Sequence, residues 1–147
     1  MKWMILSIFA VALAGCNAVD TPNQAPGSTA VYVDSLVSVY DADTFRVNIK
    51  GWPDIVGKNM PVRVLGVDAP EIRGKCENEK DQAREAKAFT KSLLENAEII
   101  ELRNIESGKY FRLLANVYVD GQDLTELLII SSHARPYDGG TREGWCE

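Results

Sequence analysis

The sequence is poor in the residues on which several classes of catalytic and metal site depend. It contains one histidine, His133, and three cysteines among 147 residues. A single imidazole excludes any mechanism or metal site that needs two, and three thiols are too few for a disulfide-framework mini-protein or for two zinc ribbons. Any chemistry must therefore be carried by carboxylates, Arg, Lys or Tyr.

The chain also lacks a basic excess. It carries 16 Lys and Arg against 21 Asp and Glu, for a formal net charge of −5. Domains that bind nucleic acid tightly through bulk charge usually have a strong basic excess, so that class is disfavoured, whereas an enzyme that contacts a few phosphates is not. With 46% hydrophobic and 25% charged residues, the composition is that of a folded domain, and the length suits one compact core.

Only the N-terminus holds a long uncharged run, which covers residues 4–15. A membrane-spanning helix takes about 20 apolar residues, so this run has the size of a secretory signal sequence instead. It ends in Leu-Ala-Gly before Cys16. Small residues ahead of a cysteine resemble the bacterial lipobox, which implies cleavage before Cys16 and acylation of that residue. An ordinary signal peptide with an incidental cysteine is the alternative.

These features predict three segments. Residues 1–15 are expected to be a lipoprotein signal peptide, residues 16–29 a lipid-anchored flexible tether, and residues 30–147 the folded domain, because the tether is polar, rich in Pro, Asn, Gly and Ser, and without periodicity. Asn17 after the cysteine favours the outer membrane over the inner one. The expected location is therefore extracytoplasmic, lipid-anchored to a bacterial envelope through Cys16 and facing the periplasm.

Two thiols remain if Cys16 carries lipid, namely Cys76 and Cys146. In an oxidising compartment an even pair favours a disulfide. The bridge would close a loop of about 70 residues and contribute about 4 kcal/mol in the chain-entropy description. Two unrelated free thiols are the alternative.

Hydrophobic periodicity predicts five strands and two helices in the folded domain. Phe45, Val47 and Ile49 alternate with polar residues as in a half-buried strand, and Ala83, Ala86 and Phe89 share one face of a helix. The strands are expected at residues 30–40, 44–49, 61–67, 99–105 and 110–119, and the helices at 77–96 and 123–130. Residues 50–59 read as a loop and 131–147 as a polar tail. We therefore expect an α+β fold, a five-stranded OB-fold β-barrel with a helix inserted after strand 3 and a short C-terminal helix, although spacing alone allows other α+β folds.

Two acidic clusters follow predicted strands, one at Asp41 and Asp43 and the other at Asp68 and Glu71. Acidic residues are common in turns, and this is the simplest reading of each cluster. Arg63 lies within the strand that precedes the second cluster. Oxygen ligands without His or Cys select Ca²⁺ or Mg²⁺. A cation, guanidinium groups and one free carboxylate together suit attack of water on a phosphodiester.

The chain resembles the staphylococcal nuclease (thermonuclease) family from about residue 36 to residue 133. The matching segments are DADT at 41–44, VRVLGVDAPE at 62–71, AKAFTK at 86–91, KYFRLLA at 109–115 and YVDG at 118–121. Each segment alone is weak, and it is their order and spacing that carry the resemblance. It implies an OB barrel that hydrolyses DNA and RNA with Ca²⁺ and leaves 3′-phosphate ends.

The resemblance also implies roles for individual residues. Asp43 and Asp68 match the calcium-binding carboxylates, and Ala69 supplies a backbone carbonyl ligand. Glu71 matches the general base that activates water.

The remaining positions of the pattern concern the substrate. Arg63 and Arg112 match the guanidinium groups on the scissile phosphate. Lys109 and Tyr110 fall where the family contacts a neighbouring phosphate, and Tyr137 stands in for an aromatic residue at the substrate cleft.

The chain departs from the family pattern at several places. Ala42 and Phe111 replace glycines, and Ala69 replaces threonine but keeps the carbonyl. Phe111 directly precedes Arg112 and could re-aim it. The chain also lacks a long basic C-terminal helix and ends in a short tail with Gly139, Gly140 and Cys146.

Single residues also allow a purely structural interpretation. Arg63 could pair with Asp41 or Glu101 across the sheet. Arg112 or Glu71 could be a solvated surface residue. For the whole chain, the alternatives to a monomeric nuclease are a catalytically inactive nuclease-like OB domain that binds nucleic acid or protein, and a structural lipoprotein. Inactive relatives usually lose the calcium carboxylates or the arginines, and this sequence keeps both.

Overall fold

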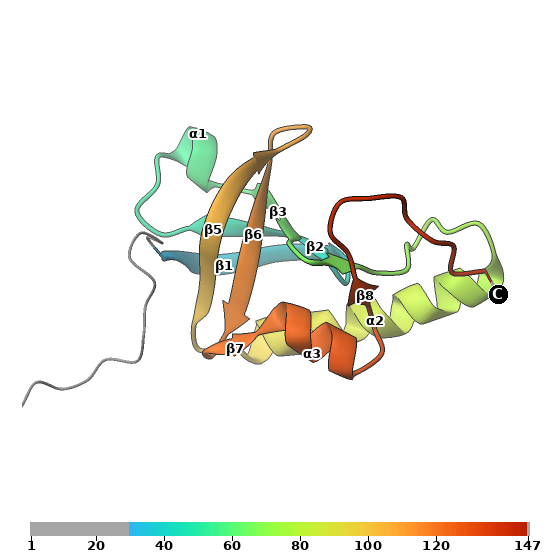
Figure 1. The fold of residues 1–147 in the computed structure, drawn as a ribbon. Helices are drawn as coiled ribbons and strands as arrows, with labels where there is room; N and C mark the ends of the chain where they lie inside the picture. Colours follow the sequence, from blue (N-terminus) through green and yellow to red (C-terminus); the bar gives the residue numbers. More distant parts are fainter. Residues whose placement is uncertain (1–29, 147) are drawn as a thin grey trace, which may run out of the picture.

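Five strands close into a barrel in the computed structural model, which describes residues 30–146 (Figure 1). Strand β1 pairs with both β2 and β5, β2 pairs with β3, and β5 pairs with β6, all antiparallel. Strands β3 and β6 pair in parallel and complete the ring. The five strands are β1 (Val31–Asp41), β2 (Thr44–Ile49), β3 (Met60–Val64), β5 (Ile100–Gly108) and β6 (Arg112–Val119). The predicted α+β OB-type barrel is confirmed. The predicted signal peptide, the tether and Cys16 lie outside the described residues.

Alternation along the strands builds the barrel core. In β2 the side chains of Phe45, Val47 and Ile49 are buried, whereas those of Thr44 and Arg46 are not. Phe45 lies in register with Val62 of β3, which is also completely buried. Each such apolar side chain stabilises the fold by about 1.5–3 kcal/mol. The period-2 pattern in the sequence therefore identified the inward-facing residues of β2.

Helix α2 (Glu77–Asn96) begins and ends where the sequence predicts and covers the barrel beside β1. Its buried face includes Ala83, Ala86, Thr90 and Leu94. The Thr90 hydroxyl donates a hydrogen bond of 2.9 Å to the carbonyl oxygen of Ala42, in the turn between β1 and β2. The helix thus fixes the backbone of the turn that carries Asp43.

A second helix, α3 (Leu124–Ile130), packs Leu124 and Leu128 completely into the core. Its N-terminus is capped by the Asp123 carboxylate, which accepts a hydrogen bond of 2.8 Å from the Thr125 backbone N–H. In the described residues 30–146, no helix is long and apolar enough to span a membrane.

The strand predicted over 61–67 is interrupted. It ends at Val64, and β4 (Val67–Asp68) forms a separate strand after Gly66, whose φ of +83° favours glycine. The predicted tail then contributes β8 (Arg135–Pro136), which pairs with β4 and places Arg135 opposite Asp68. This pairing brings the C-terminal tail to the end of the barrel that holds Asp68 (Figure 1).

Three smaller differences concern turns. The expected loop 50–59 contains one helical turn, α1 (Asp54–Gly57), and a short strand β7 (Gln122–Asp123) precedes α3. The strand expected from residue 110 starts at Arg112, because Tyr110 and Phe111 have φ angles of 61° and 53° and belong to the β5–β6 turn. A positive φ at two successive residues ends strand geometry.

A disulfide joins Cys76 and Cys146, whose Cα atoms are 5.8 Å apart. Cys76 is the N-cap residue of α2, and its sulfur accepts from the Glu79 backbone N–H. The bridge therefore fastens the last residues of the tail to the start of the long helix.

We expect Thr90→Val to lower the free energy of unfolding by about 1–3 kcal/mol, because the buried Ala42 carbonyl loses its donor while the side-chain volume is kept. Urea denaturation followed by circular dichroism measures this loss. Ser92→Ala, on the exposed side of the same helix, is the control and should change stability by less than about 0.5 kcal/mol. Equal stability of Thr90→Val and wild type would contradict the role given to this hydrogen bond.

Candidate active site

Asp43 lies at one end of the barrel with only 3% of its surface exposed. Its Oδ2 atom is 2.8 Å from Nη2 of Arg63, and its Oδ1 accepts a hydrogen bond of 2.8 Å from the Thr44 hydroxyl. The contact follows from strand register, since Thr44 of β2 pairs with Arg63 of β3. Arg63 therefore pairs with Asp43, and the simpler alternatives, Asp41 and Glu101, are wrong.

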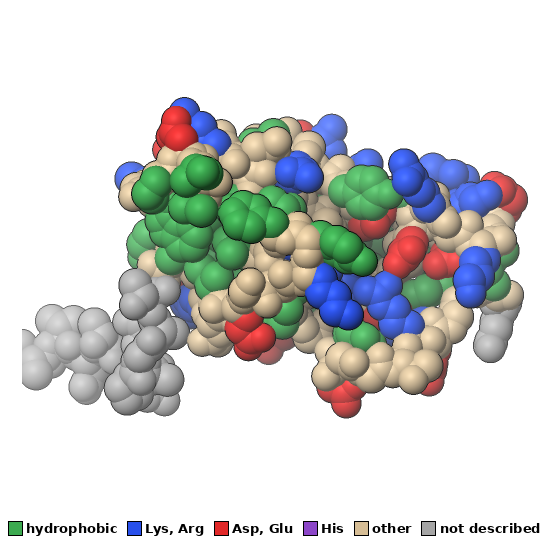
Figure 2. All heavy atoms as spheres, turned by 90° about the horizontal axis from the view of Figure 1, so that it is seen from above, with side chains coloured by type: hydrophobic (Ala, Val, Ile, Leu, Met, Phe, Trp, Pro, Cys, Tyr) green, Lys and Arg blue, Asp and Glu red, His purple; other side chains and the backbone are tan. Residues whose placement is uncertain are grey.

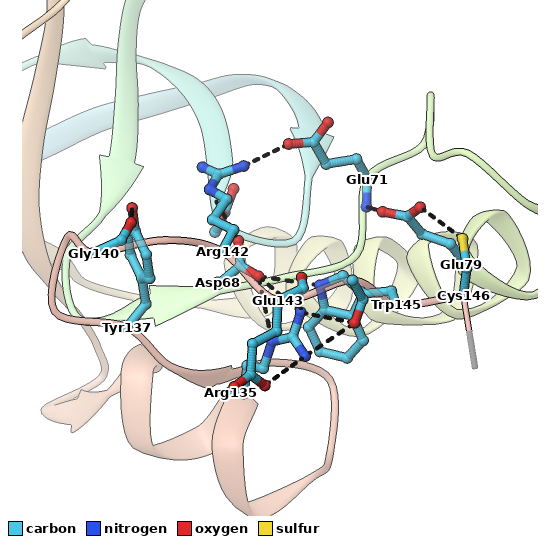
Figure 3. A network of polar contacts seen from close by, with 12 residues as sticks. Asp68, Glu71, Glu79, Arg135, Tyr137, Gly140, Arg142, Glu143, Trp145 and Cys146 are labelled. Atoms are coloured by element: carbon cyan, nitrogen blue, oxygen red, sulfur yellow. Dashed lines mark hydrogen bonds and ion pairs between the residues drawn. The ribbon is translucent and has the colours of Figure 1, made fainter.

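Asp68 is buried to the same degree and is surrounded by donors from the tail (Figure 3). Its Oδ2 atom receives the indole N–H of Trp145 at 3.1 Å and the guanidinium of Arg135 at 3.4 Å. Its Oδ1 atom lies 3.2 Å from Nε of Arg142. The planar face of Arg135 stacks on the Trp145 ring with 4.0 Å between the guanidinium carbon and the ring centroid.

Glu71 stands beside Asp68 but remains half exposed. Its Oε1 atom accepts a hydrogen bond of 2.6 Å from Nη1 of Arg142, so that one guanidinium bridges Glu71 and Asp68. The loop that carries Glu71 is held by Glu79 of α2, which accepts from the backbone N–H groups of Glu71 and Lys75. Glu71 is thus a fixed carboxylate with access to solvent.

Burial has the largest effect on the pKa values of Asp41 and Asp43. Burial raises the pKa of Asp43, against the lowering effects of the Arg63 charge and the Thr44 hydrogen bond, and the negative charge of Asp68 raises it further. Burial also raises the pKa of Asp41, where the Ile72 N–H opposes and the charges of Asp43 and Glu71 add. Acidic side chains are surrounded here by Lys and Arg, at the right-hand end of the molecule in Figure 2.

The donor set fits a hard divalent cation. Asp43 and Asp68 are carboxylates close enough for their charges to repel, and neither His nor Cys side chains share the cluster, since Cys76 and Cys146 are bridged. A doubly charged ion between two such carboxylates offsets both their repulsion and the cost of burying them. Oxygen donors of this kind suit Ca²⁺ or Mg²⁺. The carbonyl of Ala69, itself buried, directly follows Asp68.

Arg112 lies on β6, two residues before Leu114, the residue in register with Arg63. Its Nε atom is buried and has no hydrogen-bond partner among residues 30–146. The side chain borders a groove of about 430 Å³ that also contains Tyr40, Thr44 and Arg46. Phe111, which precedes it, is largely exposed. Arg112 therefore carries a buried donor without a partner among residues 30–146, and it borders a groove whose lining includes Thr44, the neighbour of Asp43.

The three residues predicted to bind substrate lie farther out. Lys109 and Tyr110 occupy the β5–β6 turn and are exposed, and Tyr110 borders the groove of Arg112. The Tyr137 hydroxyl donates to the carbonyl of Gly140 at 2.8 Å, and the ring borders a second cavity, also of about 430 Å³, with Asp68 and Arg142.

Sequence reasoning missed Arg135, Arg142 and Trp145, which make the side-chain contacts of Asp68 within residues 30–146. Within the tail they show no periodicity and match none of the motifs of the resemblance. The one available signal was the expected pairing of Cys146 with Cys76, because that bridge brings the preceding residues close to the loop after Asp68.

The raised pKa of Asp43 has a consequence for stability in metal-free protein. Because the folded state holds this proton more tightly than the unfolded chain, stability is greatest where Asp43 is protonated and falls as the pH rises from about 4 through the raised pKa. Thermal unfolding between pH 4 and 8 in a chelator should show wild type losing stability relative to Asp43→Asn with rising pH. The exposed control Asp54→Asn should run parallel to wild type, and parallel curves for Asp43→Asn would contradict the assignment.

The sequence of this chain also matches a known protein family. The sequence profile described as staphylococcal nuclease homologue matches residues 61–143, more than half of the chain. The matched region includes Arg63, Asp68, Glu71 and Arg112, together with Arg135 and Arg142 of the tail. The barrel, its inserted helix and this match agree, and the chain belongs to the staphylococcal nuclease homologue family.

Proposed function

We propose that the protein is a Ca²⁺-dependent nuclease that hydrolyses phosphodiester bonds of DNA and RNA. The observation that carries this proposal is the arrangement of two buried aspartates, Asp43 and Asp68, each in contact with an arginine, beside the half-exposed carboxylate of Glu71. Family membership supports nuclease chemistry in general, and the calcium requirement and the substrates are part of the proposal.

Asp43, Asp68 and the Ala69 carbonyl would hold the ion, whose charge stabilises negative charge developing on the phosphate oxygens. Arg63 and Arg112 bind the scissile phosphate and stabilise the same charge by hydrogen bonds. Glu71 accepts a proton from water as the water oxygen bonds to phosphorus. As the bond from phosphorus to the 5′ oxygen breaks, that oxygen takes up a proton from solvent and leaves as a hydroxyl, and the other product ends in a 3′-phosphate.

The groove of Arg112 supports contact with a nucleic-acid strand. In the described part of the chain it is bordered by Arg46, Tyr40 and Tyr110 and by no Asp or Glu, although the chain as a whole is acidic. Tyrosine rings stack on bases of any sequence, and arginines contact phosphates. Binding through so few phosphates should be weak and sensitive to salt. Lys109 and Tyr137 would add contacts on either side.

A nucleic-acid-binding domain without catalysis is the second candidate. One observation favours it: Arg142 contacts both Asp68 and Glu71, the carboxylates that the hydrolytic reading requires for the ion and for the base. Against it stands the retention of every carboxylate and arginine of the family pattern.

We further propose that the domain acts outside the cytoplasm, anchored to a bacterial envelope by lipid on Cys16 after removal of residues 1–15. The support is the lipobox-like sequence before Cys16 and the disulfide between Cys76 and Cys146, which suits an oxidising compartment.

The anchor is tested by expressing the full chain and the Cys16→Ser variant in a bacterium and partitioning the proteins in detergent. Wild type should enter the detergent phase and incorporate labelled fatty acid, while Cys16→Ser should do neither. Ser92→Ala is the control, because it leaves both Cys16 and the disulfide intact and should leave the partitioning unchanged. Identical behaviour of wild type and Cys16→Ser would exclude lipid at this residue.

Hydrolysis is tested by incubating the protein with plasmid and denatured DNA and with RNA, first with Ca²⁺ and then with a chelator. Glu71→Gln should lower the rate by at least about 100-fold, because it removes the base but keeps the shape. Glu77→Gln, an exposed glutamate at the start of α2, should retain the wild-type rate. A wild-type rate in Glu71→Gln would exclude Glu71 as the base, and a wild-type protein that binds but never cleaves would support the second candidate.

A further inference from the structure

We propose that Arg142 is a tethered internal competitor for the divalent cation, holding Asp68 and Glu71 until the ion displaces it. This inference rests on the metal site of the proposed function. Arg142 places Nε 3.2 Å from Asp68 Oδ1 and Nη1 2.6 Å from Glu71 Oε1, so its positive charge stands between these two carboxylates (Figure 3). Its charge also lowers the pKa of Asp43, which brings all three carboxylates within its influence.

Arg142 is the donor most easily displaced. The Arg63 side chain on Asp43 is 13% exposed and lies within a barrel strand, and the Arg135 side chain is 27% exposed and covered by Trp145. The Arg142 side chain is 40% exposed. A charge with partial access to water loses less when it leaves its partners, because solvent replaces part of the interaction.

The contacts that hold the C-terminal tail in place on both sides of Arg142 do not involve its guanidinium. On one side β8 pairs with β4, and on the other Cys146 is bonded to Cys76 and Trp145 donates to Asp68. The ring of Tyr137 lies 5.7 Å from the Arg142 guanidinium and offers an alternative contact once the carboxylates are taken. The guanidinium can therefore leave while the backbone of the tail stays in place.

Displacement of Arg142 by the ion would couple ion binding at Asp68 to the release of Glu71. Because one guanidinium contacts both carboxylates, its departure from Asp68 also removes the hydrogen bond to Glu71. Glu71 is then free to accept a proton from water only when the ion is bound. The same charge in the metal-free protein offsets the repulsion of the acidic cluster and keeps it stable.

Calcium binding to the full-length protein, measured by isothermal titration calorimetry without substrate, tests the competition. Arg142→Gln should bind Ca²⁺ about three- to tenfold more tightly than wild type, since the ion no longer displaces a partly exposed ion pair. The matched control is Arg73→Gln, an exposed arginine that borders a neighbouring cavity with Asp68 and Glu71. It removes the same charge close to the site and should change the affinity by less than about twofold.

A Kd for Arg142→Gln equal to or weaker than that of wild type overturns the proposal, and so does an equal gain in Arg73→Gln, which would reduce the effect to general charge. Either result leaves the proposed nuclease intact if wild type binds Ca²⁺ and Asp43→Asn does not. If neither wild type nor Arg142→Gln binds Ca²⁺, the competition and the calcium requirement of the proposed function both fail. Thermal unfolding of each variant without Ca²⁺ checks that the fold is kept.

Discussion

Everything at this end of the barrel depends on the burial of two carboxylates, Asp43 and Asp68, which are 3% and 2% exposed. Removing a charge from water costs several kcal/mol, so each carboxylate needs its own set of donors. Strand register supplies Arg63 and Thr44 to Asp43, and the C-terminal tail supplies Arg142, Trp145 and Arg135 to Asp68. The Thr90 hydrogen bond and the disulfide hold the two backbones that deliver these groups. The burial of these two acidic side chains thus lowers the stability of the fold but holds them at a fixed place, as is usual for a preorganised site.

The parts of the fold that sequence analysis predicted are those set by local patterns. The buried side of β2 and both ends of α2 follow from periods of two and of three to four residues, because the barrel buries one face of each element. The break at Gly66 and the pairing of β4 with β8 were missed, since a two-residue strand has no period and its partner lies about 70 residues farther along the chain. The strand expected to start at Tyr110 starts later for another reason, because the backbone conformation of Tyr110 and Phe111, which hydrophobicity does not reveal, keeps these two residues out of the strand.

The residues of the candidate site likewise fall into those that sequence analysis predicted and those that it missed. Resemblance to the family placed Asp43, Arg63, Asp68 and Glu71, and the described structure brings Asp43 to Arg63 through register alone. It did not place Arg142 or Arg135, because the tail of this chain has no counterpart in the motifs that carried the resemblance. Their positions follow from two long-range links, the β4–β8 pairing and the Cys76–Cys146 bridge. A residue that is positioned by such a long-range contact can be predicted from the sequence only if the contact itself is predicted.

The acidic balance of the chain is compatible with a polyanionic substrate because attraction depends on local charge rather than on the total. At the site Arg63 contacts Asp43, and Arg135 and Arg142 contact Asp68, so that these positive and negative side chains offset one another. Under the proposed function, an ion held by Asp43 and Asp68 would add two positive charges to this set, and the arginines would then present a more positive field to a phosphate. Without the ion, Arg135 and Arg142 donate to carboxylates, whereas Nε of Arg112 has no hydrogen-bond partner among residues 30–146. On this argument the ion would do more than stabilise developing charge, since it would also make this end of the barrel more attractive to phosphate.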